Sequence, residues 1–175
     1  MQEQSKDTRF EQFVLPHLGA AYNLARWLTS NDTDAEDIVQ EAYLRAYKFF
    51  GGFHGTDGRA WLLTIVRNTT YTWLQQKRSP QLTTVFDEEI HSVESDDSNP
   101  ETLLMQNLDS QLLRQSMEAL PLEFREVMIL RELEGLSYQE IADVADIPVG
   151  TVMSRLARAR KRLQLSLTNR MNKEV

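Results

Sequence analysis

Apolar residues recur along most of the chain at the three- and four-residue spacing of an α-helix. Alternation of apolar and polar residues, with the β-branched side chains that strands favour, is rare. Glycine and proline, which interrupt helices, are few, with seven and five residues in a chain of 175. The pattern therefore predicts an all-α protein.

The first strongly amphipathic segment spans residues 34–50, and Thr33 with Glu36 has the spacing of a capping box at its start. At 100° per residue, one face is expected in the core: Ala35, Ile38, Val39, Ala42, Ala46 and Phe49. The opposite face combines acids, an amide, a leucine and a lysine: Asp37, Gln40, Glu41, Leu44 and Lys48. An ordinary solvated face is one interpretation, whereas the leucine among the acids indicates a docking surface.

A glycine-rich break at 51–59 precedes a second helical segment at 60–78. Four of its residues have the spacing of a core stripe: Leu62, Val66, Thr69 and Trp73. A second stripe combines cations, amides and an aromatic ring: Thr64, Arg67, Asn68, Tyr71, Gln75 and Arg78. This mixture suits phosphates and unstacked bases, while the alternative is that the aromatic residues serve only the core.

The second half of the chain predicts four helices. The first starts near Pro100, and the second has Pro121 in its first turn and Gly135 just past its end. Ser137 and Glu140 form a capping box before a short helix that contains three apolar positions, Ile141, Ala142 and Val144. A tight turn at 145–147 and a last helix starting near Pro148 complete the pattern of a helix-turn-helix.

The last helix is expected to read DNA. Its inward stripe is Val152, Leu156, Ala159 and Leu163, and a separate face carries Thr151, Ser154, Arg155, Arg158 and Arg162. A helix fits the major groove, where arginine binds guanine edges and hydroxyl groups reach bases or phosphates. A solvated basic face is the alternative, but the preceding short helix and turn favour DNA binding.

The formal net charge of −7 seems to oppose binding to a polyanion, but the charge is segregated. Residues 79–110 contain eight acids and no Lys or Arg, while the rest of the chain is close to neutral. The last 29 residues hold seven basic groups and one acid, so the field near the last helix is positive. The acidic, non-periodic part predicts a flexible linker between two domains, with a surface loop inside one domain as the alternative.

The composition also bears on chemistry and location. The chain has no cysteine, which excludes disulfides, thiolate metal sites and a cysteine nucleophile. Its start has neither a signal peptide pattern nor an 18-residue apolar run, so a cytoplasmic protein without a membrane span is expected. The three histidines, His17, His54 and His91, lack a metal-ligand spacing, so we expect no metal, no cofactor and no enzymatic activity.

Together, the two halves resemble a known family. The segments "DAEDIVQEAYLRAY" and "RAWLLTIVRNTTYTWLQQKR" resemble the polymerase-binding and −10 segments of bacterial sigma factors. The segment "LPLEFREVMILRELEGLSYQEIADVADIPVGTVMSRLARARKRL" resembles their −35-binding domain. With no other sigma domain present, the chain resembles the extracytoplasmic function (ECF) group of the sigma-70 family.

The resemblance implies two domains with separate roles. Residues 1–79 would form a helical bundle that binds core RNA polymerase and the −10 element, 80–100 the acidic linker, and 101–175 a helix-turn-helix domain that binds the −35 element. The polymerase-binding residues would be Asp37, Gln40, Glu41, Leu44 and Lys48. The −10 residues would be Phe53, His54, Thr56, Asp57, Trp61, Thr64, Arg67, Asn68, Tyr71, Gln75 and Arg78. The −35 residues would be Thr151, Met153, Ser154, Arg155, Arg158 and Arg162.

The partners that this resemblance implies are core RNA polymerase, promoter DNA and an anti-sigma factor, with no small-molecule substrate. Two positions depart from the family pattern, because Asp146 replaces the turn glycine and Met153 replaces a basic residue. Aspartate tolerates the left-handed conformation, so the turn should form. The alternatives are a helix-turn-helix regulator that acts without polymerase and, more distantly, a metal-dependent hydrolase.

Overall fold

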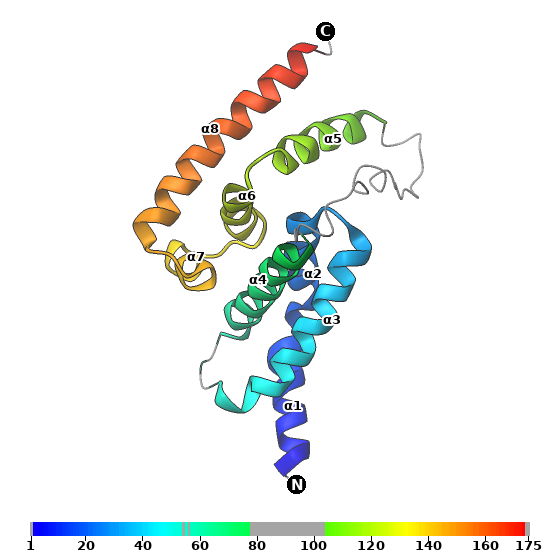
Figure 1. Ribbon diagram of the computed structural model, residues 1–175, viewed down its shortest axis with the longest axis vertical. Helices are drawn as coiled ribbons and strands as arrows, with labels where there is room; N and C mark the ends of the chain where they lie inside the picture. Colours follow the sequence, from blue (N-terminus) through cyan, green and yellow to red (C-terminus); the bar gives the residue numbers. More distant parts are fainter. Residues whose placement is uncertain (1, 54, 56, 78–103, 174–175) are drawn as a thin grey trace.

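The computed structural model describes residues 2–53, 55, 57–77 and 104–173, and every regular element in these ranges is helical. The first group of elements is α1 (Gln2–Val14), η1 (Leu15–His17), α2 (Leu18–Thr29), α3 (Asp32–Phe49), η2 (Phe50–Gly52) and α4 (Gly58–Lys77). The second group is α5 (Leu104–Glu118), α6 (Leu122–Met128), the π-helical η6 (Ile129–Leu133), α7 (Tyr138–Ala145) and α8 (Val149–Lys173). The all-α prediction with two helical domains is confirmed (Figure 1), while the predicted linker at 80–100 lies outside the described residues.

In the first domain, α2, α3 and α4 pack against one another, and α1 packs against α4. The core face predicted for α3 is largely correct, because four of its residues are buried: Ala35, Ile38, Ala42 and Ala46. Val39 is half-buried. The prediction that Phe49 lies in the core is wrong, because Phe49 is 60% exposed and Phe50 is buried instead. The α-helix ends at Phe49, and the tighter turn of η2 directs the next ring inward.

The start of α3 also differs from the prediction. Its N-cap is Asn31, whose side chain accepts a hydrogen bond of 2.9 Å from the Asp34 amide. The predicted cap, Thr33, already lies inside the helix, which begins at Asp32. Both positions offer a residue type that caps helices, and Asn31 lies early enough to bring Asp32 and Asp34 into the first turn.

Helix α4 is buried on more than one face. Three predicted core residues, Leu62, Val66 and Thr69, are buried, and Trp73 is half-buried beneath the Lys77 ammonium group. Leu63 and Thr70 are buried as well, although neither lies on the predicted stripe. The reason is that α4 contacts α2 and α3 on one side and α7 of the second domain on another.

In the second domain, α5, α6 and α7 each pack against the long helix α8. The capping box is confirmed, since Ser137 Oγ accepts from the Glu140 amide at 3.1 Å and Glu140 Oε1 accepts from the Ser137 amide at 2.8 Å. Asp146 adopts the left-handed conformation with φ of 60°, so the turn forms without glycine. The predicted inward stripe of α8 is buried at Val152, Leu156 and Ala159, and Leu163 is half-buried.

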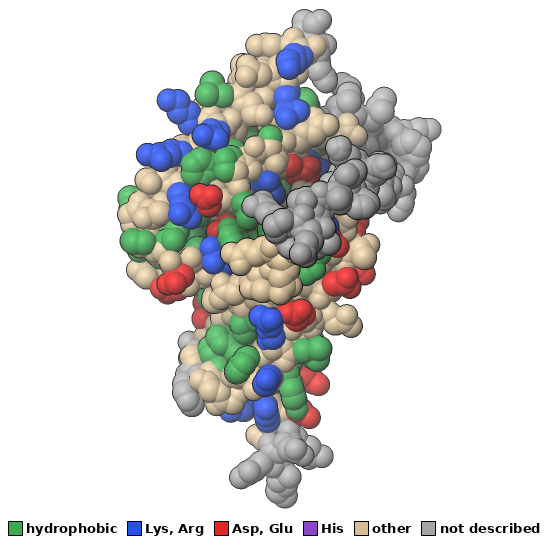
Figure 2. Space-filling view, viewed as in Figure 1, with side chains coloured by type: hydrophobic (Ala, Val, Ile, Leu, Met, Phe, Trp, Pro, Cys, Tyr) green, Lys and Arg blue, Asp and Glu red, His purple; other side chains and the backbone are tan. Residues whose placement is uncertain are grey.

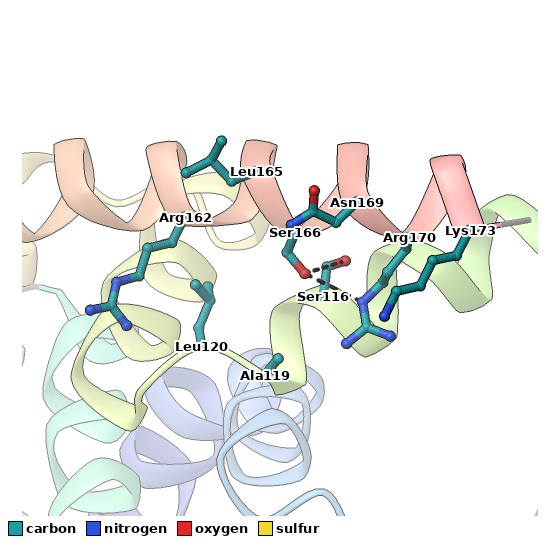
Figure 3. Close-up of a pocket in the computed structure, with 9 residues that line it drawn as sticks. All are labelled: Ser116, Ala119, Leu120, Arg162, Leu165, Ser166, Asn169, Arg170 and Lys173. Carbon is teal, nitrogen blue, oxygen red and sulfur yellow. Dashed lines mark hydrogen bonds between the residues drawn. The ribbon is translucent and has the colours of Figure 1, made fainter.

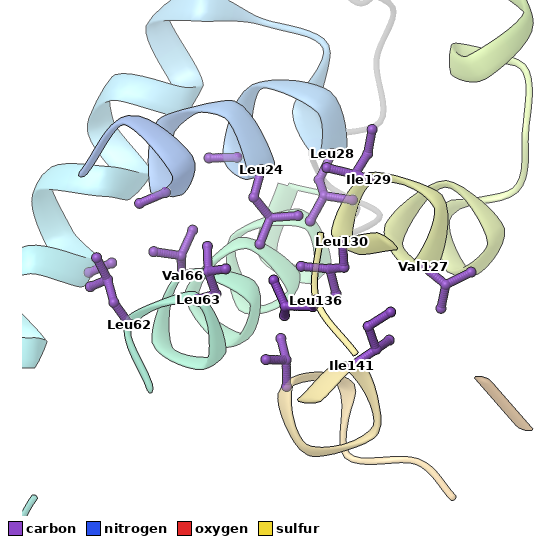
Figure 4. Packing of buried hydrophobic residues seen from close by; sticks show 14 of the residues in the cluster. Leu24, Leu28, Leu62, Leu63, Val66, Val127, Ile129, Leu130, Leu136 and Ile141 are labelled. Atoms are coloured by element: carbon purple, nitrogen blue, oxygen red, sulfur yellow. The ribbon is translucent and has the colours of Figure 1, made fainter. Parts of the chain in front are cut away.

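The hydrophobic core is continuous across the two domains. Figure 4 shows leucines and other aliphatic residues of α2 and α4 beside those of η6, the following loop and α7. The labelled residues of the first domain are Leu24, Leu28, Leu62, Leu63 and Val66, and those of the second are Val127, Ile129, Leu130, Leu136 and Ile141. The two domains are therefore closed against each other in this structure.

Gly58, the first residue of α4, is buried directly against the backbone of α1. A Cβ atom at this position would overlap the carbonyl oxygen of Phe13 and lie 3.2 Å from its carbonyl carbon. Because the obstacle is backbone, we expect Gly58→Ala to destabilise the chain by about 1–3 kcal/mol, measured by urea unfolding. Gly19→Ala is the matched control, since Gly19 lies exposed in α2 with open space around its Cβ position. Equal stability of the two variants would contradict this account.

Candidate functional site

The mixed stripe of α3 lies on the surface of the first domain. All five of its residues are exposed: Asp37, Gln40, Glu41, Leu44 and Lys48. Leu44 is 64% exposed, while Arg45 beside it forms an i,i+4 ion pair of 2.8 Å with Glu41. Phe49 adds apolar surface at the end of the same helix, and the Lys48 ammonium group lies 5.6 Å from its ring centroid. The stripe thus presents Leu44 among charged side chains, and the exposed Phe49 ring adds apolar surface next to it at the end of α3, a composition suited to contact with a protein.

The loop before α4 is built on an aromatic cluster. Phe53 stacks on Trp61 with a ring-centroid distance of 4.7 Å and an interplanar angle of 30°. The ring of Phe13 meets Phe53 edge-on at 6.0 Å, and Phe50 lies 6.1 Å from it. These contacts hold the loop against the first domain. The sequence-predicted residues His54 and Thr56 of this loop, and Arg78 beyond α4, lie outside the described residues.

Asp57 has a structural role at the start of α4. Its Oδ1 atom accepts a hydrogen bond of 3.1 Å from the Ala60 amide, as an N-cap does. Partial burial would raise the pKa of Asp57, but the hydrogen bond from the Ala60 amide and the charge of Arg59 help to lower it overall. Asp57 therefore remains ionised and fixes the loop to the helix.

The stripe predicted on α4 is divided by the structure. Asn68 and Gln75 are exposed, and Thr64 donates a hydrogen bond of 2.8 Å to the Ala60 carbonyl. Arg67 and Tyr71 instead reach into the second domain. The Arg67 Nε atom and the Tyr71 hydroxyl group, at 2.9 Å, donate to the two carboxylate oxygens of Glu126. The Glu126 carboxylate of α6 therefore binds two of the side chains that were predicted to contact DNA, Arg67 and Tyr71.

Glu126 is fully buried, and it is not among the residues that the sequence patterns predict for a functional site. Burial would lower the pKa of Arg67, but the hydrogen bond and charge of Glu126 outweigh it and raise that pKa. Burial raises the pKa of Tyr71, and the charge of Glu126 raises it further, so the hydroxyl group stays protonated and donates. The burial of Glu126 could have been predicted from the sequence, because Glu126 lies four residues after Leu122 and four before Leu130, on the apolar stripe of its helix.

The predicted reading face of α8 is open. Met153 is 53% exposed, Ser154 and Arg158 are exposed, and Arg155 and Thr151 are partly exposed. Within the ranges that the structure describes, neither Arg155 nor Arg158 forms an ion pair. Figure 2 shows Lys and Arg side chains gathered over α8. The first half of α8 thus presents cations and a hydroxyl group that are available to a polyanion.

Arg162 lies one helical turn beyond Arg158 on α8, and its side chain turns toward Phe124. Its guanidinium group is 5.2 Å from the Phe124 ring centroid, and it lines a groove of about 530 Å³ between α5 and α8 (Figure 3). The other lining residues are Ser116, Ala119, Leu120, Leu165, Ser166, Asn169, Arg170 and Lys173. Ser166 donates to Ser116 at 3.2 Å and accepts from the Arg170 Nε atom at 3.3 Å, which joins the two helices.

The described part of the chain holds neither a membrane-spanning helix nor a cluster of metal-ligating side chains. None of its helices is long and apolar enough to cross a membrane. None of its histidine, aspartate and glutamate side chains gather in a group of three that could hold a metal ion.

Family models match both domains. Residues 13–79 match the model of Sigma-70 region 2, and residues 110–163 match the model of Sigma-70, region 4. The two matched ranges contain the α3 stripe, the α4 stripe, the helix-turn-helix and Glu126. They occur in the order that the sequence resemblance implies.

Relatives with known names agree with these models. The chain is 39% identical over 145 residues to the ECF RNA polymerase sigma-E factor of Escherichia coli strain K12, covering 79% of this chain and 75% of that protein. It matches the sigma factor RpoE of Bartonella quintana, solved in complex with the anti-sigma factor NepR, with a TM-score of 0.75 and 33% identity over 91% of this chain and 97% of that one. The fold also matches CnrH, solved with the cytosolic domain of CnrY, with a TM-score of 0.66 and 24% identity over 93% of this chain and 90% of that one. The chain belongs to the ECF group of RNA polymerase sigma factors.

Proposed function

We propose that the chain binds core RNA polymerase through α3, directs it to promoters and helps to open them. The α3 surface for polymerase consists of Asp37, Gln40, Glu41, Leu44 and Lys48, extended by Phe49. Its support is the exposure of large apolar side chains among charges, since burying such a side chain against a partner stabilises the complex. Membership in the sigma factor family indicates that the partner is core RNA polymerase, and the exposed Leu44 indicates where the contact forms.

The DNA-binding surfaces lie on two different helices in this proposal. The −10 element contacts the loop before α4 and the α4 stripe, where Phe53 and Trp61 provide aromatic rings and Asn68 an exposed amide. The −35 element contacts Thr151, Met153, Ser154, Arg155 and Arg158 of α8. The assignment of the −35 element to α8 rests on Arg155 and Arg158, which have no ion-pair partner in the described ranges. The opposite face of the same helix is buried, so these arginines lie on its open side.

The two contacts act together. Each surface alone is small, and its affinity for DNA should fall steeply with salt. A polymerase that holds both surfaces makes the second contact effectively intramolecular. Trapping an unstacked base then offsets the cost of opening the duplex, so the chain itself performs no covalent chemistry and uses no cofactor.

In this proposal, residues 1–79 form the domain that binds polymerase and the −10 element, residues 80–100 form the linker, and residues 101–175 form the domain that binds the −35 element. An anti-sigma factor is proposed as the regulatory partner, because the structurally similar sigma factor RpoE of Bartonella quintana was solved in complex with the anti-sigma factor NepR. Since core polymerase and chromosomal DNA are in the bacterial cytoplasm, the proposed location is cytoplasmic.

Run-off transcription tests the function. Core RNA polymerase with the purified chain should produce discrete transcripts from a subset of genomic fragments, and core polymerase alone should not. Mapping their start sites then gives the promoter sequence. If the chain bound duplex DNA specifically but never associated with polymerase or produced transcripts, it would be an independent regulator instead, an alternative that the family comparisons do not favour.

A further inference from the structure

The strongest feature outside the exposed surfaces is the buried carboxylate at the boundary between the domains. Glu126 of α6 is fully buried and accepts from Arg67 and Tyr71 of α4, which lie 59 and 55 residues away in the sequence. The Arg67 side chain is 17% exposed, and its guanidinium group lies 3.9 Å from the Tyr71 ring centroid. These three side chains form one compact cluster, named here the Glu126 cluster.

Other contacts close the same boundary. Arg59 of α4 donates a hydrogen bond of 2.9 Å to the Glu134 carbonyl, and Arg125 of α6 donates one of 3.0 Å to the Trp27 carbonyl of α2. The continuous apolar core lies beside them, with Leu63 on one side and Leu136 on the other (Figure 4). The charged cluster is thus one component of an interface that also buries apolar surface.

We propose that Glu126 latches the two domains in a closed form and competes with promoter DNA for Arg67 and Tyr71. This inference rests on the proposed function, which places Arg67 and Tyr71 on the −10 surface. While Glu126 holds them, the α4 stripe is incomplete, because Asn68 and Gln75 are exposed whereas Arg67 and Tyr71 are bound to the second domain. Binding of the −10 strand through the full stripe therefore requires the two domains to separate.

The physical basis is a difference in solvation between the closed and open forms. In the closed form a buried carboxylate needs its donors, because an unpaired buried charge is strongly unfavourable. In the open form water hydrates Glu126, and Arg67 is free to bind phosphate. A glutamine at position 126 keeps one acceptor oxygen and replaces the other with an NH2 group that cannot accept, so one of the two donor contacts is lost and the other loses its charge. The substitution therefore destabilises only the closed form.

Distance measurement within the chain tests the latch directly. Because the chain contains no cysteine, Asn23→Cys and Gln164→Cys, both at exposed positions, allow a donor and an acceptor dye to be attached to α2 and α8. In this labelled chain Glu126→Gln should lower the energy-transfer efficiency and raise the open-to-closed ratio by about tenfold. Glu132→Gln is the matched control, since Glu132 is exposed and its only described ion pair is with Arg160, within the second domain. It should leave the transfer efficiency unchanged.

Binding of DNA by the free chain provides the second measurement. A labelled single-stranded oligonucleotide pool of random sequence should bind the Glu126→Gln variant up to about tenfold more tightly, because a larger fraction of the chain is competent to bind. Unchanged energy transfer, or equal changes for Glu126→Gln and Glu132→Gln, would refute the latch. Lower energy transfer with unchanged oligonucleotide affinity would refute the competition for Arg67 and Tyr71.

Two additional controls address misfolding of the variant and failure of the proposed function. If circular dichroism shows that Glu126→Gln is unfolded, Tyr71→Phe replaces it, because that change removes only the hydroxyl donor; unchanged energy transfer in Tyr71→Phe would then overturn the latch. Run-off transcription by the unaltered chain is measured in parallel. Its failure would count against the proposed function, whereas the energy-transfer result depends only on the closed interface.

Discussion

Leu44→Asp is expected to weaken binding of the chain to core RNA polymerase by about 30-fold or more, which is the effect of losing an interface anchor of at least ~2 kcal/mol. Leu44 is 64% exposed on α3 between Gln40 and Lys48, so nothing in the fold requires its apolar side chain. An aspartate there would remove the apolar anchor and place a charge where the partner buries surface. The dissociation constant, measured by fluorescence anisotropy of labelled chain titrated with core polymerase, checks this.

A control separates the α3 surface from exposed leucines in general. Leu15, in η1 of the same domain, is 45% exposed and allows the same substitution away from the stripe. Leu15→Asp should bind polymerase as the unaltered chain does, and both variants should keep the same unfolding midpoint in urea. Equal losses for the two variants, or normal binding by Leu44→Asp, would show that α3 does not dock on polymerase through this leucine.

The features that follow from helical periodicity could be predicted from the sequence. Buried positions such as Ile38, Leu62 and Leu156 recur with the repeat of the helix that contains them, so a single sequence suffices to identify the core face. The Ser137 capping box and the left-handed turn at Asp146 are equally local, because each depends on the conformation of a few neighbouring residues. The capping box and the turn fix where α8 begins, so the exposed side of its first turns could also be predicted from the sequence.

The features that depend on helix ends or on distant parts of the chain could not be predicted in the same way. Phe49 and Phe50 are consecutive rings, and only the exact end of α3 decides which one is buried. The donors of Glu126 are more than 50 residues away, and no periodicity links α4 to α6. The stripe on α4 was therefore identified as a set, but its division between exposed and covered residues appears only in the folded chain.

Arg158→Ala is expected to lower promoter-dependent transcription by roughly 5- to 150-fold, equivalent to the ~1–3 kcal/mol of a good side-chain contact with a base. Arg158 is exposed on α8, one turn beyond Ser154, and it forms no ion pair within the described ranges. Removing it therefore costs the fold little while it removes a cation from the reading face. Run-off transcription on the mapped promoter measures the loss, and the affinity for core polymerase should stay unchanged.

Arg160→Ala provides the matched control, because it removes the same charge from the same helix. Arg160 lies two residues away, about 200° around the helix from Arg158, and pairs with Glu132 at 3.1 Å. If the effect came from the general positive field of α8, both substitutions would reduce transcription alike and make its salt dependence equally less steep. If Arg158 reads the −35 element, only its loss should change which base pairs are preferred there, because a contact with phosphate weakens all sequences equally. Loss of polymerase binding by Arg158→Ala would instead contradict the division of roles between α3 and α8.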